Sequence, residues 1–402
     1  MNFKNSVLFH NRAVMLLLTS RLASTFAFQM LAVTVGWQMY SITGSNFYLG
    51  LVGLVQFIPM LLFTFAAGHV ADKYNRKVVI AVSQVVEGAA VFVLAFASLF
   101  GLINRESLLV LCFCFGSGNA FQGPSMQSLL PNIVDRADFS RAVALSSSAT
   151  QLGVIIGPGL GGLLYSLGPD VVYFIIGALL LASAAAVVLI SVKFTDSPHQ
   201  SEGLKGLFAG LAYIWSKPGI FGAISLDLFA VLLGGATALL PAYATILHAG
   251  PVGLGLLRSA PAVGALLVTF FLTRRPIKTK AGRKMFIAVI IFGLSTIAFA
   301  VSKSMLLSLL AMVVLGASDV VSVVIRGTFV QIETPDALRG RVSSVNQLFI
   351  GASNQLGEFE SGVAASLLGG PVPAALLGGV GTIVVALVWM RLFPALRRVD
   401  KL

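Results

Sequence analysis

The chain consists of apolar segments, each long enough to cross a lipid bilayer, separated by short polar turns. A membrane-spanning helix needs about 20 apolar residues, and this rule places twelve spans in the sequence. They lie at residues 14–40, 46–70, 77–100, 107–129, 142–165, 171–192, 219–246, 253–273, 284–302, 305–325, 343–367 and 373–392. Helices are predicted because the segments lack the strict alternation of a barrel strand. The sequence therefore predicts an all-α membrane protein with twelve transmembrane helices.

The composition leaves little surface for water. Of 402 residues, 57% are hydrophobic and 10% are charged, against about 25% charged residues in soluble domains. The net charge of +12 does not indicate a nucleic-acid partner, because Lys and Arg form short clusters between the spans. Of these 27 residues, 22 lie on the side of the N-terminus, three on the opposite side and two within spans. Cytoplasmic loops carry such an excess, so both termini are predicted to be cytoplasmic.

The most polar stretch, residues 193–217, divides the spans into two groups of six. Within it, Leu207, Leu211 and Ile214 recur at helical spacing, which predicts a short amphipathic helix on the inner membrane surface. The predicted domains are residues 1–192, the linker 193–217 and residues 218–402. Similar triplets recur at 49–51 and 254–256 and at 75–77 and 282–284, offsets of 205 and 207 residues. Nearly equal offsets in matching loops indicate an internal duplication, as transporters use.

The loop after the second span, Gly68 to Lys77, reads GHVADKYNRK. It resembles the signature loop of the major facilitator superfamily, with Gly68, Asp72, Arg76 and Lys77 at the motif positions. We expect Gly68 to allow a close approach, Asp72 to meet a helix N-terminus or a basic partner, and the basic pair to anchor the turn. Asn75 replaces the motif's glycine, and Asn tolerates left-handed backbone better than most residues. The resemblance implies a two-half fold that works by alternating access.

The fifth span carries glycines at every fourth position, Gly153, Gly157 and Gly161, with Pro158 and Gly162 beside them. These glycines share one helix face, suited to close packing against another helix, and Pro158 favours a bend. The stretch resembles the fifth-helix motif of superfamily members that export substrate against protons. We expect it at the seam between the halves. Many such antiporters carry an arginine in the fourth helix, and this chain has none there.

Two further stretches, residues 37–40 and 339–342, resemble the branch that includes bacterial enterobactin and macrolide exporters. This resemblance implies a multi-pass protein of the bacterial inner membrane. It covers essentially the whole chain.

Ionisable residues within spans are functional candidates, because burying a charge in lipid costs several kcal/mol. Arg21 and Asp227 are 206 residues apart, close to the repeat offset, and are predicted to interact across the halves. Glu87 has no basic residue at its depth, which suits either proton transfer or a static hydrogen bond. Arg326, near the inner end of its predicted span, is expected to reach the membrane surface. Glu360 lies near an outer end and is expected to be solvated.

The eleventh span carries a polar stripe on one helix face, which suits either a cavity wall or a hydrogen-bonded helix contact. Its members are Gln347, Gly351, Asn354, Gln355 and Glu358. The proton-coupling candidates are Glu87, Asp227, Asp319 and Glu358. The substrate-cavity candidates are Arg21, Gln29, Gln347, Asn354, Gln355 and Arg326.

We therefore expect a secondary active exporter of a small amphiphile, a siderophore or a drug, that works by proton antiport. Uptake of a nutrient or lipid, or a sensor that does not transport, are the alternatives. No enzyme activity, cofactor or metal is expected, because the chain has neither a phosphate-binding GxxxxGK[ST] loop nor a metal-ligand cluster. A monomer is expected. In-span acids outnumber in-span arginines, which favours cations or protons, whereas Arg21 would suit an anionic siderophore; both stay open.

Overall fold

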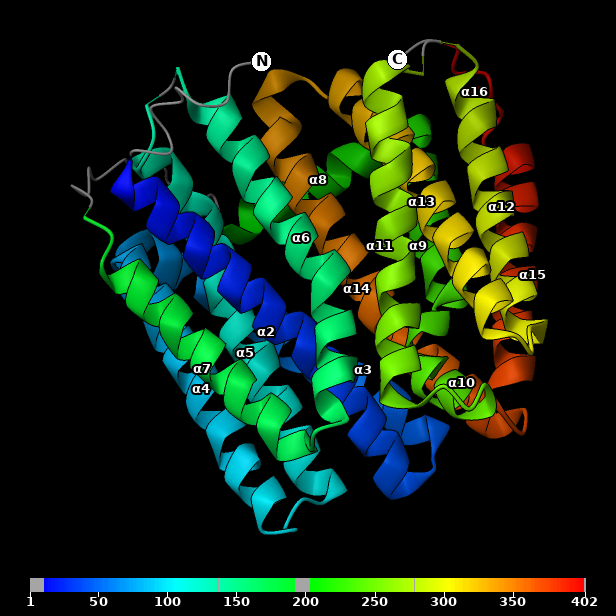
Figure 1. The fold of residues 1–402 in the computed structure, drawn as a ribbon. Helices are drawn as coiled ribbons and strands as arrows, with labels where there is room; N and C mark the ends of the chain where they lie inside the picture. The colour runs from blue at the N-terminus through cyan, green and yellow to red at the C-terminus, as the bar shows by residue number, and fades with distance from the viewer. Residues whose placement is uncertain (1–10, 136, 192–202, 278, 401–402) are drawn as a thin grey trace. The chain divides into compact units, whose positions relative to one another are not determined.

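A computed structural model describes residues 11–135, 137–191, 203–277 and 279–400. Within these ranges the regular structure is helical and contains no strand (Figure 1). The chain divides into two compact units, unit 1 (Met1–Ile42 and Val55–Gly203) and unit 2 (Thr43–Leu54 and Leu204–Leu402). The division passes through α3 (Asn46–Lys73), whose first turns therefore belong to unit 2.

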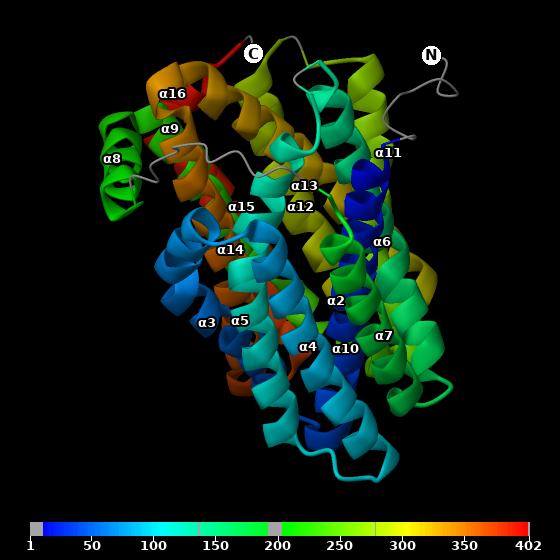
Figure 2. The same ribbon diagram turned by 90° about the vertical axis from the view of Figure 1, so that its left-hand side faces the viewer.

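The helices of unit 1 correspond to the first six predicted spans. Besides most of α3, they are α2 (Arg12–Thr43), α4 (Arg76–Leu99), α5 (Arg105–Leu129), α6 (Phe139–Tyr165) and α7 (Pro169–Val188), with the short η2 (Leu130–Asn132). Helix α4 packs against α5 and α7 (Figure 2). Buried hydrogen bonds join α2 to α7: the Ser20 and Ser183 hydroxyls lie 2.8 Å apart, and Tyr173 donates to Gln38 Oε1 at 2.5 Å.

Unit 2 contains the remaining helices. They are α8 (Gly203–Ser216), α9 (Pro218–Gly234), η3 (Ala236–Leu239), α10 (Leu240–Ile246), α11 (Gly250–Arg274), α12 (Ala281–Val301), α13 (Met305–Glu333), α14 (Asp336–Leu367), α15 (Pro371–Leu392) and α16 (Pro394–Arg397). Helix α9 packs against α14 and α15, and α13 packs against α11 and α12. Trp389 of α15 donates to the Ser225 hydroxyl of α9 at 2.9 Å, which adds a polar link between these helices.

The seventh predicted span, 219–246, is present as Pro218–Ile246, but it is not one continuous helix as predicted. Helix α9 ends at Gly234, and η3 and α10 continue the crossing. Glycine is a poor helix former, and a Cβ at Gly235 would lie 2.9 Å from the carbonyl carbon of Gly357. The two glycines therefore allow α14 to approach the backbone where the helix breaks.

Helix α8 forms part of the predicted linker, whose residues 193–202 lie outside the described residues. It contacts α14, because a Cβ at Gly210 would lie 2.8 Å from the Arg341 carbonyl oxygen. Phe208 and Trp215 are 61% and 66% exposed, so α8 presents large apolar side chains outward.

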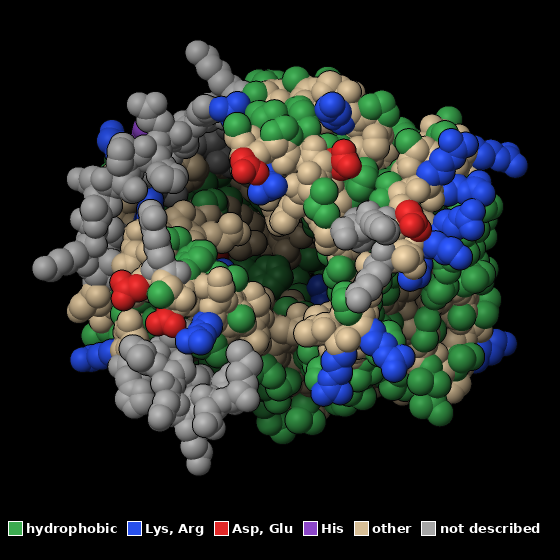
Figure 3. All heavy atoms as spheres, turned by 90° about the horizontal axis from the view of Figure 1, so that it is seen from above, with side chains coloured by type: hydrophobic (Ala, Val, Ile, Leu, Met, Phe, Trp, Pro, Cys, Tyr) green, Lys and Arg blue, Asp and Glu red, His purple; other side chains and the backbone are tan. Residues whose placement is uncertain are grey.

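All twelve predicted spans are helical segments in the structure. Among the described residues, ten segments are long and apolar enough to cross a membrane by length and hydropathy, with Pro218–Ile246 counted as one segment, and α5 and α14 are not among them. Lys280, Arg283, Arg397 and Arg398 of unit 2 line one pocket. The face seen from above carries many Lys and Arg side chains (Figure 3).

Candidate functional site

A polar cavity of about 290 Å³ lies among the helices of unit 1. Its polar lining consists of Ser24, Thr25 and Gln29 of α2, Glu87 of α4, Asn119 and Gln122 of α5, and Thr150 of α6. The structure thus brings together two candidates, Gln29 and Glu87. Asn119 and Gln122 were not predicted as cavity residues. Two amide side chains in the fourth span are more than a lipid-facing helix would carry, and this feature could have identified them.

Glu87 is 3% exposed, and its side chain lines this cavity. Among the described residues it has no ion pair and no hydrogen-bond partner. Gly118 of α5 leaves room for the Glu87 carboxylate, since a Cβ at Gly118 would collide with Glu87 Oε1. The static hydrogen bond considered for Glu87 is therefore not found within the described part of the chain, and the carboxylate is left facing the cavity.

The glycine stripe of α6 packs on α2 of the same unit. A Cβ at Gly153 would lie 2.8 Å from Thr25 Cβ, one at Gly157 would lie 2.8 Å from Gln29 Cβ, and one at Gly161 would lie 2.9 Å from Met30 Cα. This face of the helix is therefore a contact within unit 1, and the expectation of a seam between the halves does not describe it. Because Thr25 and Gln29 also line the cavity, the stripe holds one of its walls.

Arg21 lies on α2 and donates to the Ser146 hydroxyl of α6. It is only partly buried and is not among the cavity-lining residues. The partner predicted for it, Asp227, is engaged by another arginine.

Asp227 of α9 forms an ion pair with Arg326 of α13, and the two side chains are only 11% and 4% exposed. Arg326 is therefore buried in an ion pair, whereas the sequence predicted a side chain that extends outward to the membrane surface. The reason is that α13 continues to Glu333, whereas the predicted span ended at residue 325. Arg326 consequently lies inside the packed unit, and a buried charge requires a partner.

Asp319 lies two turns before Arg326 on α13, on the same helix face. Asp319 and Asp227 line one small cavity of about 10 Å³, together with the hydroxyl-bearing Ser318 and Ser322. Arg326 also lines a second cavity of about 220 Å³, with Gln347 and Asn346 of α14. The Asp227–Arg326 pair thus lies between a small acidic cavity and a larger polar one.

The polar stripe of α14 has two environments. In its N-terminal half, Gln347 lines the 220 Å³ cavity with Arg326. In its C-terminal half, the Glu358 side chain packs on Gly53 of α3, where a Cβ would lie 2.8 Å from Glu358 Oε2. Asn354 is exposed, and Gln355 Oε1 is buried with no hydrogen-bond partner in the described part of the chain. Glu360 is partly buried and accepts a hydrogen bond from Ser361 at 3.4 Å, so it is not simply solvated.

The signature loop ties α4 to two neighbours. Arg76 donates to the Ser128 carbonyl oxygen at 3.0 Å, and Lys77 donates to the Ile190 carbonyl oxygen. Asn75 has φ −61° and ψ 112° and caps α4 by accepting from Lys77 N, so it is not left-handed as its place in the motif suggested. A Cβ at Gly68 would have no neighbour within 4 Å, so the expected close approach is not found among the described residues. The Asp72 side chain lies outside what the structure describes.

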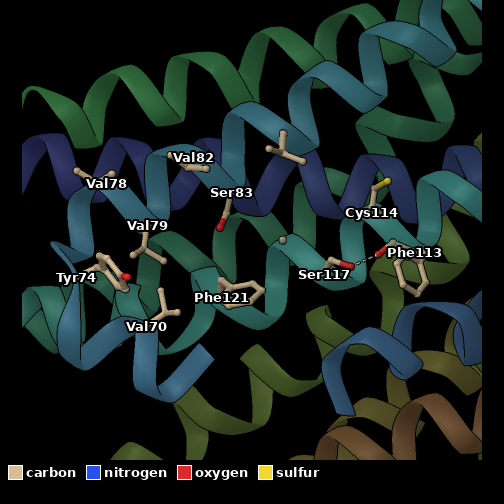
Figure 4. Close-up of a pocket in the computed structure, with 12 residues that line it drawn as sticks. Val70, Tyr74, Val78, Val79, Val82, Ser83, Phe113, Cys114, Ser117 and Phe121 are labelled. Atoms are coloured by element: carbon tan, nitrogen blue, oxygen red, sulfur yellow. Dashed lines mark hydrogen bonds between the residues drawn. The ribbon is translucent and has the colours of Figure 1, made fainter. Parts of the chain in front are cut away.

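An apolar groove of about 520 Å³ runs between the end of α3 and helices α4 and α5 (Figure 4). Val78, Val82 and Phe113 line it, and Ser117, which also lines it, donates to the Phe113 carbonyl oxygen rather than into the groove. Such a surface suits lipid chains. Within the described ranges, no three His, Cys, Asp or Glu side chains are grouped as a metal site would require.

Comparison with known proteins agrees with this architecture. A family model described as transmembrane secretion effector matches residues 7–402. The enterobactin exporter EntS of Citrobacter koseri is 28% identical, with 96% of this chain and 92% of that protein aligned. The same exporter of Escherichia coli O1:K1 / APEC is 26% identical over the same shares.

Solved structures show the same fold. A bacterial homologue of the lysosomal transporter Spinster has a TM-score of 0.73 at 16% identity, with 96% of this chain and 97% of that chain covered. A bacterial homologue of the iron transporter ferroportin has a TM-score of 0.71 at 18% identity, with 95% and 98% covered. The chain therefore belongs to the transmembrane secretion effector family of the major facilitator superfamily, whose members are membrane transporters and not enzymes.

Proposed function

We propose that the protein exports a small amphiphilic molecule, a siderophore or a drug, across the bacterial inner membrane in exchange for protons. Both termini face the cytoplasm in this proposal. The observation that carries it is the Asp227–Arg326 ion pair of unit 2, which separates Asp319 from a larger polar cavity. Asp227, Arg326 and a protonated Asp319 together carry no net charge, so a proton can move between the two acids without changing the net charge buried in unit 2.

The proton step follows from the charges. With the Asp227–Arg326 pair formed, Asp319 has no cationic partner in the described residues and is neutral when protonated. A cavity of about 10 Å³ joins Asp319 and Asp227, and a space of that size holds roughly one water molecule. A proton that passes from Asp319 through this water to Asp227 removes the charge that holds Arg326. Arg326 is then free to turn toward the cavity of about 220 Å³ that it already lines.

This change can be coupled to alternating access because α9, α13 and α14 meet at the same place. Asp227 lies on α9, which is broken at Gly234 beside α14. Arg326 lies on α13, and the cavity that would receive its side chain is walled by α14. Release of the ion pair would therefore act on three helices of unit 2.

Export rather than uptake is supported by the fifth-helix motif from Gly153 to Gly162 and by the relatives named enterobactin exporters. Those names also make a siderophore one substrate class to test. Nutrient uptake remains the second candidate function, and a sensor that does not transport is the third.

The test uses inverted membrane vesicles, acidified inside by respiration and loaded with a pH-sensitive dye. Adding siderophores or lipophilic drugs outside should release protons from the lumen and carry the added compound inward. Asp319→Asn should abolish substrate-dependent proton release, whereas the matched Glu106→Gln, at an exposed acid, should not. Transport without proton release would refute antiport, and binding without any transport would support the sensor.

A further inference from the structure

We infer that the polar cavity of unit 1 binds the protonated amine of a substrate, with the Glu87 carboxylate as its counter-charge. The inference rests on the proposed function only in that the bound molecule is cargo. The cavity measures about 290 Å³, and among the described residues that line it Glu87 is the only acidic or basic one. Ligand pockets for whole drug-sized molecules hold about 300–1,000 Å³, so this one suits a compact head group.

The carboxylate is buried without compensation from the protein. Glu87 is 3% exposed and has no ion pair with any described residue. An isolated charge in an apolar interior is unfavourable by many kcal/mol, so a proton or a cationic ligand must neutralise it. At Asp227 of unit 2 the buried carboxylate is neutralised by Arg326. Glu87 has no such cationic side chain beside it in the described part of the chain.

The basic residues of unit 1 are placed elsewhere. Arg21 is the one Lys or Arg in the central parts of its described helices, and its guanidinium donates to Ser146. Arg76 and Lys77 donate to backbone carbonyls at the start of α4. Arg105 and Arg141 lie at the first turns of α5 and α6, and each has an acidic neighbour, Glu106 or Asp138. Asp170, the remaining acid of the packed helices, lies in the first turn of α7.

The other lining groups suit an ammonium ion. Gln29, Asn119 and Gln122 line the cavity and have no hydrogen-bond partner among the described residues, so their carbonyl oxygens are available to accept N–H bonds. Phe28 and Phe115 also line it, with ring centroids 6.4 Å apart. Aromatic faces attract cations. A carboxylate, amide oxygens and two aromatic rings together favour a cation and disfavour an anion.

Gly118 preserves the position of the carboxylate. A Cβ at this position would overlap Glu87 Oε1, so Gly118→Ala must move the carboxylate without removing it. The residue therefore offers a second variant, which tests the geometry of the site separately from its charge.

The experiment measures equilibrium binding to the purified full-length protein in detergent by titration calorimetry. The probes are 4-phenylbutylamine, 4-phenylbutanol and 4-phenylbutyrate, which share one aryl tail and differ in charge. We expect the amine to bind about tenfold or more tightly than the alcohol, as hydrogen bonds to charged groups allow, and the acid to bind weakest. Glu87→Gln should remove the preference for the amine, Gly118→Ala should weaken it, and Glu106→Gln, at an exposed acid of the same unit, should preserve it.

Equal binding of amine and alcohol to the wild-type protein would overturn the inference, as would a preference that survives Glu87→Gln. If Glu87→Gln does not fold, as judged by size exclusion, the inference is tested by the two remaining measurements. The wild-type protein must prefer the amine, and Gly118→Ala must weaken that preference. Binding requires no transport, so amine selectivity without proton release in vesicles would refute the proposed function alone. Proton-coupled transport with no amine selectivity would refute this inference alone.

Discussion

Replacing Arg326 with Met should destabilise unit 2 strongly, because it leaves Asp227 as a buried, unpaired charge. The two side chains are 4% and 11% exposed, so little water reaches either of them. Removal of one partner of a buried ion pair costs about 3–5 kcal/mol, whereas replacing both partners with apolar residues is often neutral or stabilising. Asp227→Leu alone should be damaging for the converse reason, and the double variant Asp227→Leu/Arg326→Met should be close to the wild type.

The measurement is the free energy of unfolding, obtained by titrating detergent-solubilised protein with SDS. Trp389 is a suitable fluorescent reporter, since it donates to Ser225 on α9, the helix that carries Asp227. With single effects of about 3–5 kcal/mol each and a double variant close to the wild type, the double-mutant cycle should give an interaction energy of about 6–10 kcal/mol in magnitude, above the range of about 0.5–3 kcal/mol that is usual for residues in contact. Strict additivity of the two single effects would refute the reasoning, because it would mean that neither charge depends on the other. The double variant should also fail to release protons in the vesicle assay, because it lacks the carboxylate and the arginine that the proposed proton step requires. Its stability and its proton coupling should therefore change independently.

Two further predictions concern packing in unit 1. Gly161→Val should destabilise the protein by about 1–3 kcal/mol and impair export with normal membrane insertion, because its Cβ would lie 2.9 Å from the Met30 backbone. Gly123→Val is the control, with no atom within 4 Å of the new Cβ, and equal effects at both sites would contradict the packing argument. Tyr173→Phe removes the hydroxyl that donates to the buried Gln38 at 2.5 Å and should cost about 1–3 kcal/mol in the same SDS titration. Tyr74→Phe, at an exposed ring, should have no measurable effect.

Helix number could be predicted from the sequence because lipid imposes a length and a composition on each span. The predicted fourth span, 107–129, differs from α5 by only two residues at one end. The seventh span is present as Pro218–Ile246, but its helix is interrupted after Gly234. Apolar length does not report helix continuity, and Gly235 lies against Gly357 of α14 at the point where the helix is interrupted.

Sequence spacing did not identify the partners of the charged residues. The repeat offset paired Arg21 with Asp227, whereas the structure pairs Asp227 with Arg326. The error began with a boundary: a span that ended at residue 325 would leave Arg326 at the membrane surface, and α13 extends to Glu333. Which helix lies opposite a given face is a property of packing, and one sequence contains no direct record of it.

The sequence feature that could have located the cavities is the low hydropathy of two of the predicted spans. Helices α5 and α14 are the two predicted spans that are long enough but not apolar enough to be identified as membrane-spanning by hydropathy. Helix α5 supplies Asn119 and Gln122 to the unit 1 cavity, and α14 supplies Asn346 and Gln347 to the cavity beside Arg326. A transmembrane helix retains polar side chains only where they face protein or water. The least apolar spans of such a chain are therefore the ones to search first for its binding sites, and in each unit that search leads to an ionisable residue, Glu87 or Arg326.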